Sequence, residues 1–567
     1  MRTFALLLFC TSIACGSGLE RPRNVRASVS ADAIEVWWEP VPGVSGYRVQ
    51  LADLDSRAPV GEAKFVSQPR ARLPLSRATG VWVDALRGAL SERAVGFVTG
   101  GAAGGDGSAW QIFGPADFRN GSVHVSFASL SAGEHLGVLL VNWAGKDTAS
   151  ASVDLTGTAQ PGAAPPRSAA LSMSTRPPPI SDLAQEQAAG PAAASEAAPQ
   201  SAQRSFCVAQ SLDFSRHVRK ATTRVASSDH ADFFVDDEDA AHYQPGYFQP
   251  IVAAFEERVW PADARAFGLP TDVDQNGKIV VLFTHELGQH LNGGWLIGYF
   301  ANGDLLRSRD GSANCSDSGS NHGEIIYLND VQNGAANGFS PAELAATSYP
   351  ATLAHELQHL INLGHRCVEK RCDGPEQTWI NEALSKVAED LAGFGWNGAQ
   401  GRGEGAQYLT RSSGSVRGYD GRSLTHWEGD PIGNYQGAHS FLRFFTDRFG
   451  DVLPGAVAQG QGGIEGLEDA LGRPLPRAMA EWATALLISN EPSAPYNFSG
   501  AAWSPLHERL RHLDYRNLGE SATMRADGIA AFVSGPSSGG SAEVIVRSGE
   551  EVPPHVVVVR VAGALPR

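Results

Sequence analysis

The pentapeptide His355-Glu356-Leu357-Gln358-His359 constrains the fold of this chain more than any other stretch. An α-helix places residues four apart on one face, so His355 and His359 can offer two imidazole nitrogens to a single metal ion. Glu356 then lies beside that ion, where it can exchange a proton with water rather than bind the metal. The motif therefore predicts a helix with a zinc site on one face.

The residues on either side of the motif favour the same helix. Pro350 suits a first helical turn, and Gly364 suits a helix end. Apolar residues at helical spacing between them predict a buried face, namely Leu353, Ala354, Leu357, Leu360 and Ile361. An ordinary helix with two partly buried histidines is the alternative, and it explains this context less well.

Catalytic zinc sites take three protein ligands and leave one position for water, and two residues compete for the third place. Glu382 lies 23 residues after His359, near the start of a second stretch with helical spacing. His365 has the histidine spacing of the metzincins, but Asn362 stands where their glycine turns the chain. A methionine turn is also missing at a plausible distance. We favour Glu382 and keep His365 as the alternative third ligand.

A second motif, Trp379-Ile380-Asn381-Glu382-Ala383-Leu384-Ser385, follows the first. With it, residues from about 247 to 488 resemble the hyicolysin-type neutral zinc metallopeptidases, in a little under half of the chain. The resemblance implies a secreted endopeptidase with a gluzincin-like core and one catalytic zinc ion. It also implies His355, His359 and Glu382 as zinc ligands, Glu356 as the catalytic base, and proteins or peptides outside the cell as substrates.

The expected reaction is hydrolysis of a peptide bond, in which Glu356 accepts a proton from water and passes it to the leaving amine. Tyr435 is the candidate for stabilising the oxyanion. The run Tyr435-Gln436-Gly437-Ala438 resembles the Tyr-x-x-Gly-Ala of gluzincin aminopeptidases, with the glycine one residue earlier. His439 and His426 are alternatives for this role.

Metal-bound histidines usually donate their other ring N–H to a carboxylate. Glu389 follows Glu382 by seven residues and thus lies on the same helical face, and Asp390 is next to it. Either could orient a histidine, but a solvated acidic face is the more ordinary interpretation, and we favour it.

Two stretches before the motif predict strands. Asp272-Val273-Asp274-Gln275-Asn276-Gly277-Lys278 has the order of a calcium loop, but its twelfth position is Phe283, where such loops carry glutamate. We therefore favour an Asx-type turn that enters a buried strand. Glu324-Ile325-Ile326-Tyr327-Leu328 predicts the other strand, which we expect to bind a substrate backbone by strand addition.

The first residues predict export. A short charged region precedes the apolar residues 4–9, and small residues lead to Cys15. Residues 1–15 resemble a bacterial lipoprotein signal, which implies a lipidated Cys15 and attachment to the outer membrane or cell surface. Ordinary cleavage and secretion is the alternative.

Four cysteines remain outside this signal, an even number in an exported chain. Cys367 and Cys372 flank only four residues and predict a small local disulfide loop, which leaves Cys207 to pair with Cys315. A zinc site of four cysteines is disfavoured because the spacing has no short cysteine pairs.

The chain is expected to be multidomain: all-β N-terminal modules, an α+β zincin-like peptidase domain with a helical C-terminal subdomain, and a small β terminal piece. The first module resembles fibronectin type III through Pro22, Val25, Val36, Trp38, Gly46, Tyr47 and Val49. Its tryptophan and tyrosine would be core residues without a further function. The expected parts are the module at 21–99, a small β domain at 105–158, an Ala/Pro-rich linker at 160–204, the peptidase domain at 205–495 and a β segment at 520–567.

Composition excludes several partners. The formal net charge is -16 and no basic cluster stands out, which argues against nucleic acid. After the signal, no apolar run reaches the roughly 20 residues needed to span a bilayer. Oligomeric state is not indicated. The competing function is a surface binding protein or adhesin with an inactive peptidase core, and the complete motif argues against it.

Overall fold

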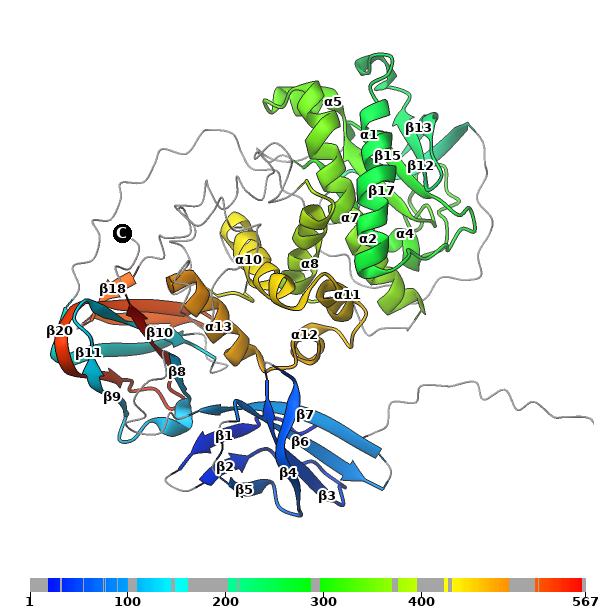
Figure 1. Ribbon diagram of the computed structural model, residues 1–567. Helices are drawn as coiled ribbons and strands as arrows, with labels where there is room; N and C mark the ends of the chain where they lie inside the picture. The colour runs from blue at the N-terminus through cyan, green and yellow to red at the C-terminus, as the bar shows by residue number, and fades with distance from the viewer. Residues whose placement is uncertain are drawn as a thin grey trace, which may run out of the picture.

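The computed structural model describes residues 19–30, 33–54, 56–74, 76, 78–88, 90–99, 110–143, 148–161, 202–211, 214–286, 296–369, 376–394, 423–426, 431–488, 515–518 and 520–562 (Figure 1). The chain is multidomain, with two β parts and a mixed α/β part that continues into a group of helices. The predicted signal and nearly all of the predicted linker lie outside the described residues.

The N-terminal part, at the bottom of Figure 1, is an all-β module with strand order β4-β3-β6-β7-β1-β2-β5. All pairs are antiparallel except β1 with β7. Trp38 and Tyr47 lie in its core with ring centroids 5.0 Å apart, and the Tyr47 hydroxyl accepts a hydrogen bond from the Val41 amide at 2.7 Å. The strands are β1 (Arg26–Val29), β2 (Ala33–Trp37), β3 (Gly46–Asp53), β4 (Ala58–Val66), β5 (Arg70–Pro74), β6 (Gly80–Arg87) and β7 (Leu90–Thr99).

The second β part differs from the sequence prediction, because residues 105–158 and 520–567 do not form two separate pieces. Strands from both segments alternate in one sheet of order β19-β11-β20-β10-β21-β8, and β9 and β18 also pair with β20. The strands of each segment pair mainly with strands of the other segment. The apolar side chains of both segments meet in one core. The elements are β8 (Trp110–Phe113), η1 (Pro115–Asp117), β9 (Ser122–Leu130), β10 (Glu134–Val141), β11 (Thr148–Pro161), β18 (Tyr515–Asn517), β19 (Ser521–Arg525), β20 (Ile529–Arg547) and β21 (His555–Ala562).

The mixed part contains a six-stranded sheet of order β12-β13-β14-β15-β17-β16. Its central strands β14, β15 and β17 are parallel, and β16 pairs antiparallel with β17. β15 is apolar along its length because both faces of the sheet are covered: Val281 and Phe283 face the helices, and Val280 and Leu282 face a second core. The strands are β12 (Gln203–Ala209), β13 (His217–Ser227), β14 (Ala231–Asp236), β15 (Ile279–Thr284), β16 (Gly298–Phe300) and β17 (Ile325–Asn329).

The expectation that the strand beginning near Glu324 adds a substrate backbone is wrong. That strand is β17, and both of its edges already pair, with β15 on one side and β16 on the other. Sequence shows that a stretch is extended but does not show its place in the sheet.

Helices cover the sheet and carry the HExxH motif. Every residue of α7 is buried, and Pro350 lies in its first turn as predicted. The helix does not stop at Gly364, whose φ of −54° is helical, but continues as the π-helical turn η5. The elements are η2 (Ala240–His242), α1 (Gln249–Ala254), η3 (Phe255–Val259), α2 (Trp260–Phe267), α4 (Asn302–Leu306), α5 (Val331–Ala336), α6 (Pro341–Glu343), η4 (Leu344–Ser348), α7 (Tyr349–Leu363), η5 (Gly364–Glu369) and α8 (Thr378–Leu391).

A helical group follows and links the three parts. Helix α13 packs on β10 and β21 of the second β part. Two contacts join the N-terminal module to these helices. Arg21 of the module pairs with Asp469 at 2.9 Å, and Arg473 of the helical group donates to the Leu54 carbonyl of the module at 3.0 Å. The helices are α10 (Pro431–Phe449), α11 (Val452–Ala458), α12 (Gly463–Leu471) and α13 (Leu475–Ile488).

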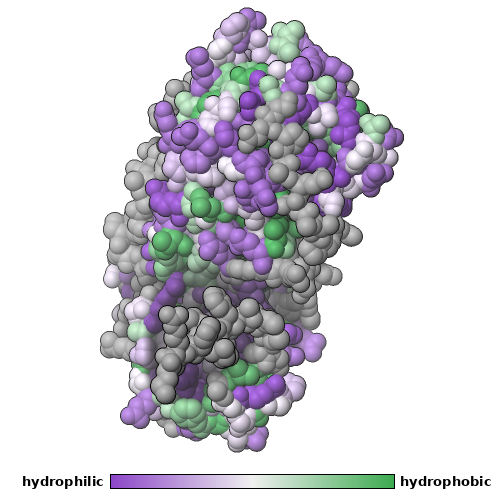
Figure 2. Space-filling model, turned by 90° about the vertical axis from the view of Figure 1, so that its right-hand side faces the viewer, coloured by the Kyte–Doolittle hydropathy of each residue, from purple (hydrophilic) through white to green (hydrophobic). Residues whose placement is uncertain are grey.

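The surface is largely polar on the face that Figure 2 shows, where coloured hydrophobic residues form small separate groups. Within the described segments, we find no helix with the length and apolarity needed to cross a membrane.

Candidate metal centre

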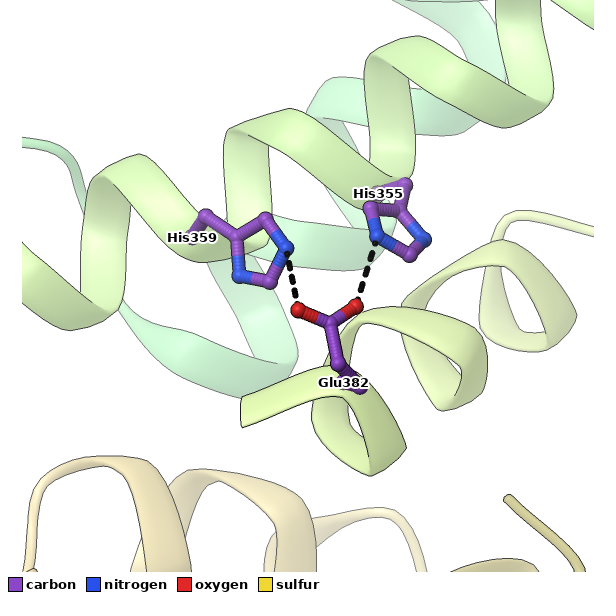
Figure 3. A group of neighbouring side chains, drawn as sticks. All are labelled: His355, His359 and Glu382. Carbon is purple, nitrogen blue, oxygen red and sulfur yellow. Dashed lines mark ion pairs between the residues drawn. The ribbon is translucent and has the colours of Figure 1, made fainter. Parts of the chain in front are cut away.

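Helices α7 and α8 bring three predicted ligands together (Figure 3). His355 and His359 lie one turn apart on α7, and Glu382 reaches them from α8. His355 Nε2 lies 3.2 Å from Glu382 Oε2, and His359 Nε2 lies 3.5 Å from Glu382 Oε1. All three side chains are buried, and one ligand atom of each lies within 4.8 Å of the other two.

A carboxylate fixes the tautomer of His355. Its Nδ1 lies 2.8 Å from Glu389 Oε1, and since an ionised carboxylate only accepts hydrogen bonds, Nδ1 carries the proton. The lone pair of the neutral ring is then on Nε2, the nitrogen that faces Glu382.

The hydroxyl of Ser385 fixes the tautomer of His359. The hydroxyl of Ser385 donates to Gln358 Oε1 at 2.5 Å, so it accepts from His359 Nδ1 at 3.0 Å. Although His359 Nε2 is also 3.3 Å from this hydroxyl, Nδ1 is the closer nitrogen. Both imidazoles thus present Nε2 to one point.

Glu389 is buried, so the expected solvated acidic face is wrong. Its two oxygens accept from the Lys386 ammonium at 2.7 and 2.9 Å. Burial alone would raise the pKa of Glu389, but the charge of Lys386 and the hydrogen bond from His355 outweigh it and lower the pKa. The carboxylate beside His355 is therefore ionised.

Asp390 is buried as well and joins α8 to α10. It accepts from His439 Nε2 at 2.7 Å and from Arg443 Nη1 at 3.3 Å. His439, one of the alternatives to Tyr435, therefore serves this helix contact. The other, His426, lies near Thr425 and Asp527 and is mostly exposed.

The remaining predicted residues are placed as follows. Glu356 is buried on α7 directly after His355. Tyr435 is partly buried on α10, which packs on α8. His365 lies on η5, where its Nδ1 bonds Glu369 at 2.8 Å, and it is not part of the group around Glu382.

The donor set fits zinc. Two neutral imidazole nitrogens and one carboxylate are a common ligand set of catalytic zinc sites, which leave a fourth position open. The sequence analysis missed Ser385 and Lys386, which hold His359 and Glu389. Their signal was spacing, because Ser385 lies one helical turn after Glu382 and Lys386 lies one turn before Glu389.

The structure describes both cysteines of one predicted disulfide and one cysteine of the other. Cys207 and Cys315 are bonded, which confirms the predicted pairing. Cys367 is also disulfide-bonded, and Cys372, its predicted partner, lies outside the described residues.

Comparisons with known proteins give one distant relative. The chain is 23% identical to the "Neutral metalloprotease ShpI" of Staphylococcus hyicus over 282 residues, which cover 48% of this chain and 58% of that protein. The match thus spans little more than half of the relative's length. No protein-family model matches the chain.

A solved structure described as "Crystal Structure of FN3tt" is 9% identical and covers 14% of this chain and 95% of its own, with a TM-score of 0.12, too low to define a fold. The relative ShpI is a metalloprotease by its name, and in this chain the buried His355, His359 and Glu382 form a group that could hold a metal ion.

Proposed function

We propose that the chain is a zinc-dependent endopeptidase with His355, His359 and Glu382 as zinc ligands and Glu356 as general base. The convergence of these three ligands, with both histidine tautomers set by Glu389 and Ser385, carries the proposal. The name of the relative, a neutral metalloprotease, supports the same reaction class.

A bound zinc ion supplies Lewis acidity, which polarises a scissile carbonyl and lowers the pKa of water. Glu356 accepts the proton of the attacking water and later gives it to the leaving amine. Glu389 and Ser385 keep His355 and His359 neutral and aimed, so the two rings need no reorganisation during the reaction. Tyr435 is our candidate for stabilising the oxyanion.

Strand β16 is the proposed binding edge for the substrate backbone. It is the last strand of the sheet and packs against α7. A Cβ on Gly298 would lie 2.6 Å from the Tyr327 carbonyl oxygen and 2.8 Å from Thr352 Cγ2, so glycine permits this close approach. An extended peptide added to β16 would run beside the helix that carries the ligands.

The other parts of the proposal concern location and architecture. Residues 1–15 export the chain, and a lipidated Cys15 holds it at the cell surface, where its substrates are proteins or peptides. The seven-stranded N-terminal module, with Trp38 and Tyr47 in its core, is fibronectin type III-like, and the mixed sheet with α7 and α8 is zincin-like.

Glu356→Gln in the full chain tests the mechanism, with zinc content and casein cleavage measured on the same samples. We expect full zinc content and loss of cleavage, because glutamine cannot accept the proton. Glu369→Gln, at an exposed glutamate ten residues beyond the motif on η5, is the matched control and should retain both. Residual cleavage by Glu356→Gln contradicts the mechanism, and zinc without proteolysis in the wild type favours a binding protein.

A further inference from the structure

Three carboxylates outside the zinc group converge at the amino ends of two parallel strands. Asp272 and Asp274 belong to the turn before β15, and Glu324 directly precedes β17. One oxygen from each lies within 4.8 Å of the other two. The sequence pattern of a calcium loop is incomplete because Phe283 occupies its twelfth position, and Glu324 supplies a carboxylate to that turn from another strand.

The Glu324 carboxylate is buried beside the two aspartates. It is 2% exposed, and its Oε1 accepts from Thr271 Oγ1 at 2.9 Å and from the Val273 amide at 3.0 Å. Its Oε2 is buried and has no hydrogen-bond partner among the residues that the structure describes. Burial of a carboxylate oxygen without a partner is unfavourable unless a proton or a metal ion binds it.

The electrostatics agree with this geometry. Burial raises the pKa of Glu324 to about 7, against the two hydrogen bonds that lower it, and the charges of Asp274 and Asp272 raise it further. Burial also raises the pKa of Asp274, which Arg204 and Arg309 lower from a distance. These shifts mean that Glu324 and Asp274 resist being anionic together.

Neighbouring cations do not neutralise the group directly. The Lys278 ammonium turns to the Ser228 carbonyl, 2.6 Å away. Across the described segments, no lysine, arginine or histidine forms an ion pair with Asp272, Asp274 or Glu324. Arg204 and Arg309 act on Asp274 only at longer range, so the group can accept a further cation.

We propose that Asp272, Asp274 and Glu324 bind a calcium ion. The donors are all carboxylate oxygens, which suit a hard cation and not zinc, for which this chain has a nitrogen-containing site. Oxygens within 4.8 Å of one another need at most a small inward movement to reach one ion at the 2.3–2.6 Å typical of calcium. Water and loop oxygens would complete the coordination.

The ion would stabilise the scaffold of the zinc group. Glu324 also accepts the Val280 amide through its backbone carbonyl at 2.7 Å, so the site joins the starts of β15 and β17. Thr271, at the head of the turn, packs against the end of α7, where a Cβ on Gly364 would lie 2.9 Å from its Cγ2. Calcium at this turn would therefore brace the helix that carries His355 and His359.

Calcium binding is measured directly by equilibrium dialysis with radioactive calcium chloride. The full chain carries Glu356→Gln in every sample to prevent self-digestion. We expect one calcium per chain with a Kd of about 10⁻⁴–10⁻³ M, the range of extracellular calcium modules, and a higher Tm when calcium is added. Glu324→Gln should abolish binding. Asp272→Asn, at an exposed position that leaves the fold intact, should weaken binding roughly tenfold or more.

Asp239→Asn is the control, because Asp239 belongs to a separate group with Asp236 and His285 that could also hold a metal. It should bind calcium like the parent. Absence of calcium binding in the parent overturns the inference, as does binding that survives Glu324→Gln and Asp272→Asn or is lost in Asp239→Asn. Zinc content in the same samples keeps this outcome separate from the proposed peptidase, which does not depend on it.

Discussion

Replacing Glu389 by glutamine tests how the structure supports its zinc ligands. The Glu389 carboxylate accepts a hydrogen bond from His355 Nδ1 at 2.8 Å. Its two oxygens also accept from the Lys386 ammonium, at 2.7 and 2.9 Å. Both charged side chains are about 95% buried or more. Glutamine keeps the shape of Glu389 but removes its charge and one of its acceptor oxygens.

Two effects of different size are expected. Removing one partner of a buried ion pair destabilises a protein by about 3–5 kcal/mol, because the other charge remains buried. Loss of the carboxylate that orients a metal-bound histidine weakens metal affinity about 10–100-fold, or roughly 1.4–2.8 kcal/mol. Glu389→Gln should therefore lower both the free energy of unfolding and zinc affinity.

A second change separates the two effects. Lys386→Met in the Glu389→Gln background removes the buried ammonium and keeps a side chain of similar length. Urea denaturation should show most of the stability restored, whereas competition with a zinc-binding dye should still show the weakened affinity. Recovery of zinc affinity in the double variant would refute the positioning role of Glu389, and unchanged stability in the single variant would refute the buried ion pair.

Three further predictions concern stability. Burial lowers the pKa of His555 to about 4. The free energy of unfolding should therefore fall by roughly 2–3 kcal/mol when the pH is lowered from above 6.5 to 4.5, because the buried ring is then charged only on unfolding. Urea denaturation should show a smaller fall in His555→Phe. Asp310 accepts five hydrogen bonds from four residues of its loop, and these outweigh burial and hold the pKa of its carboxyl well below the ordinary value. Asp310→Ala should lower the free energy of unfolding by about 3 kcal/mol or more at pH 7, measured by urea denaturation. The difference in stability between wild type and variant should shrink as the pH falls below about 4. Replacing Cys207 and Cys315 by serine opens a link across 108 residues and should lower the free energy of unfolding by about 4–5 kcal/mol; an unchanged value would contradict the role of the disulfide.

Local patterns predicted the elements that depend on neighbours in sequence. Helical spacing placed α7 over the HExxH motif, and the short separation of two cysteines left Cys207 for Cys315. The turn at 272–278 has the expected Asx hydrogen bonds, such as that from the Lys278 amide to Asn276 Oδ1 at 2.5 Å. The helix and the turn depend on contacts between residues close in sequence. The disulfide was predictable because only one pair of cysteines was left.

Contacts between distant segments were out of reach. β10 pairs with β20 and β21, which lie about 400 residues later, so the sequence predicted two separate β pieces. Glu389 and Asp390 looked solvated because the sequence does not show that Glu389 faces α7 and Asp390 faces α10. Glu324 is 50 residues from Asp274, and only the parallel pairing of β15 with β17 brings them together.

Zinc content of the purified full chain tests the central claim most directly. Elemental analysis should find one zinc ion per chain in the wild type and in His365→Ala, and none in Glu382→Ala. Zinc that persists in Glu382→Ala and disappears in His365→Ala would contradict the ligand set, and a wild type without zinc would contradict the proposed peptidase.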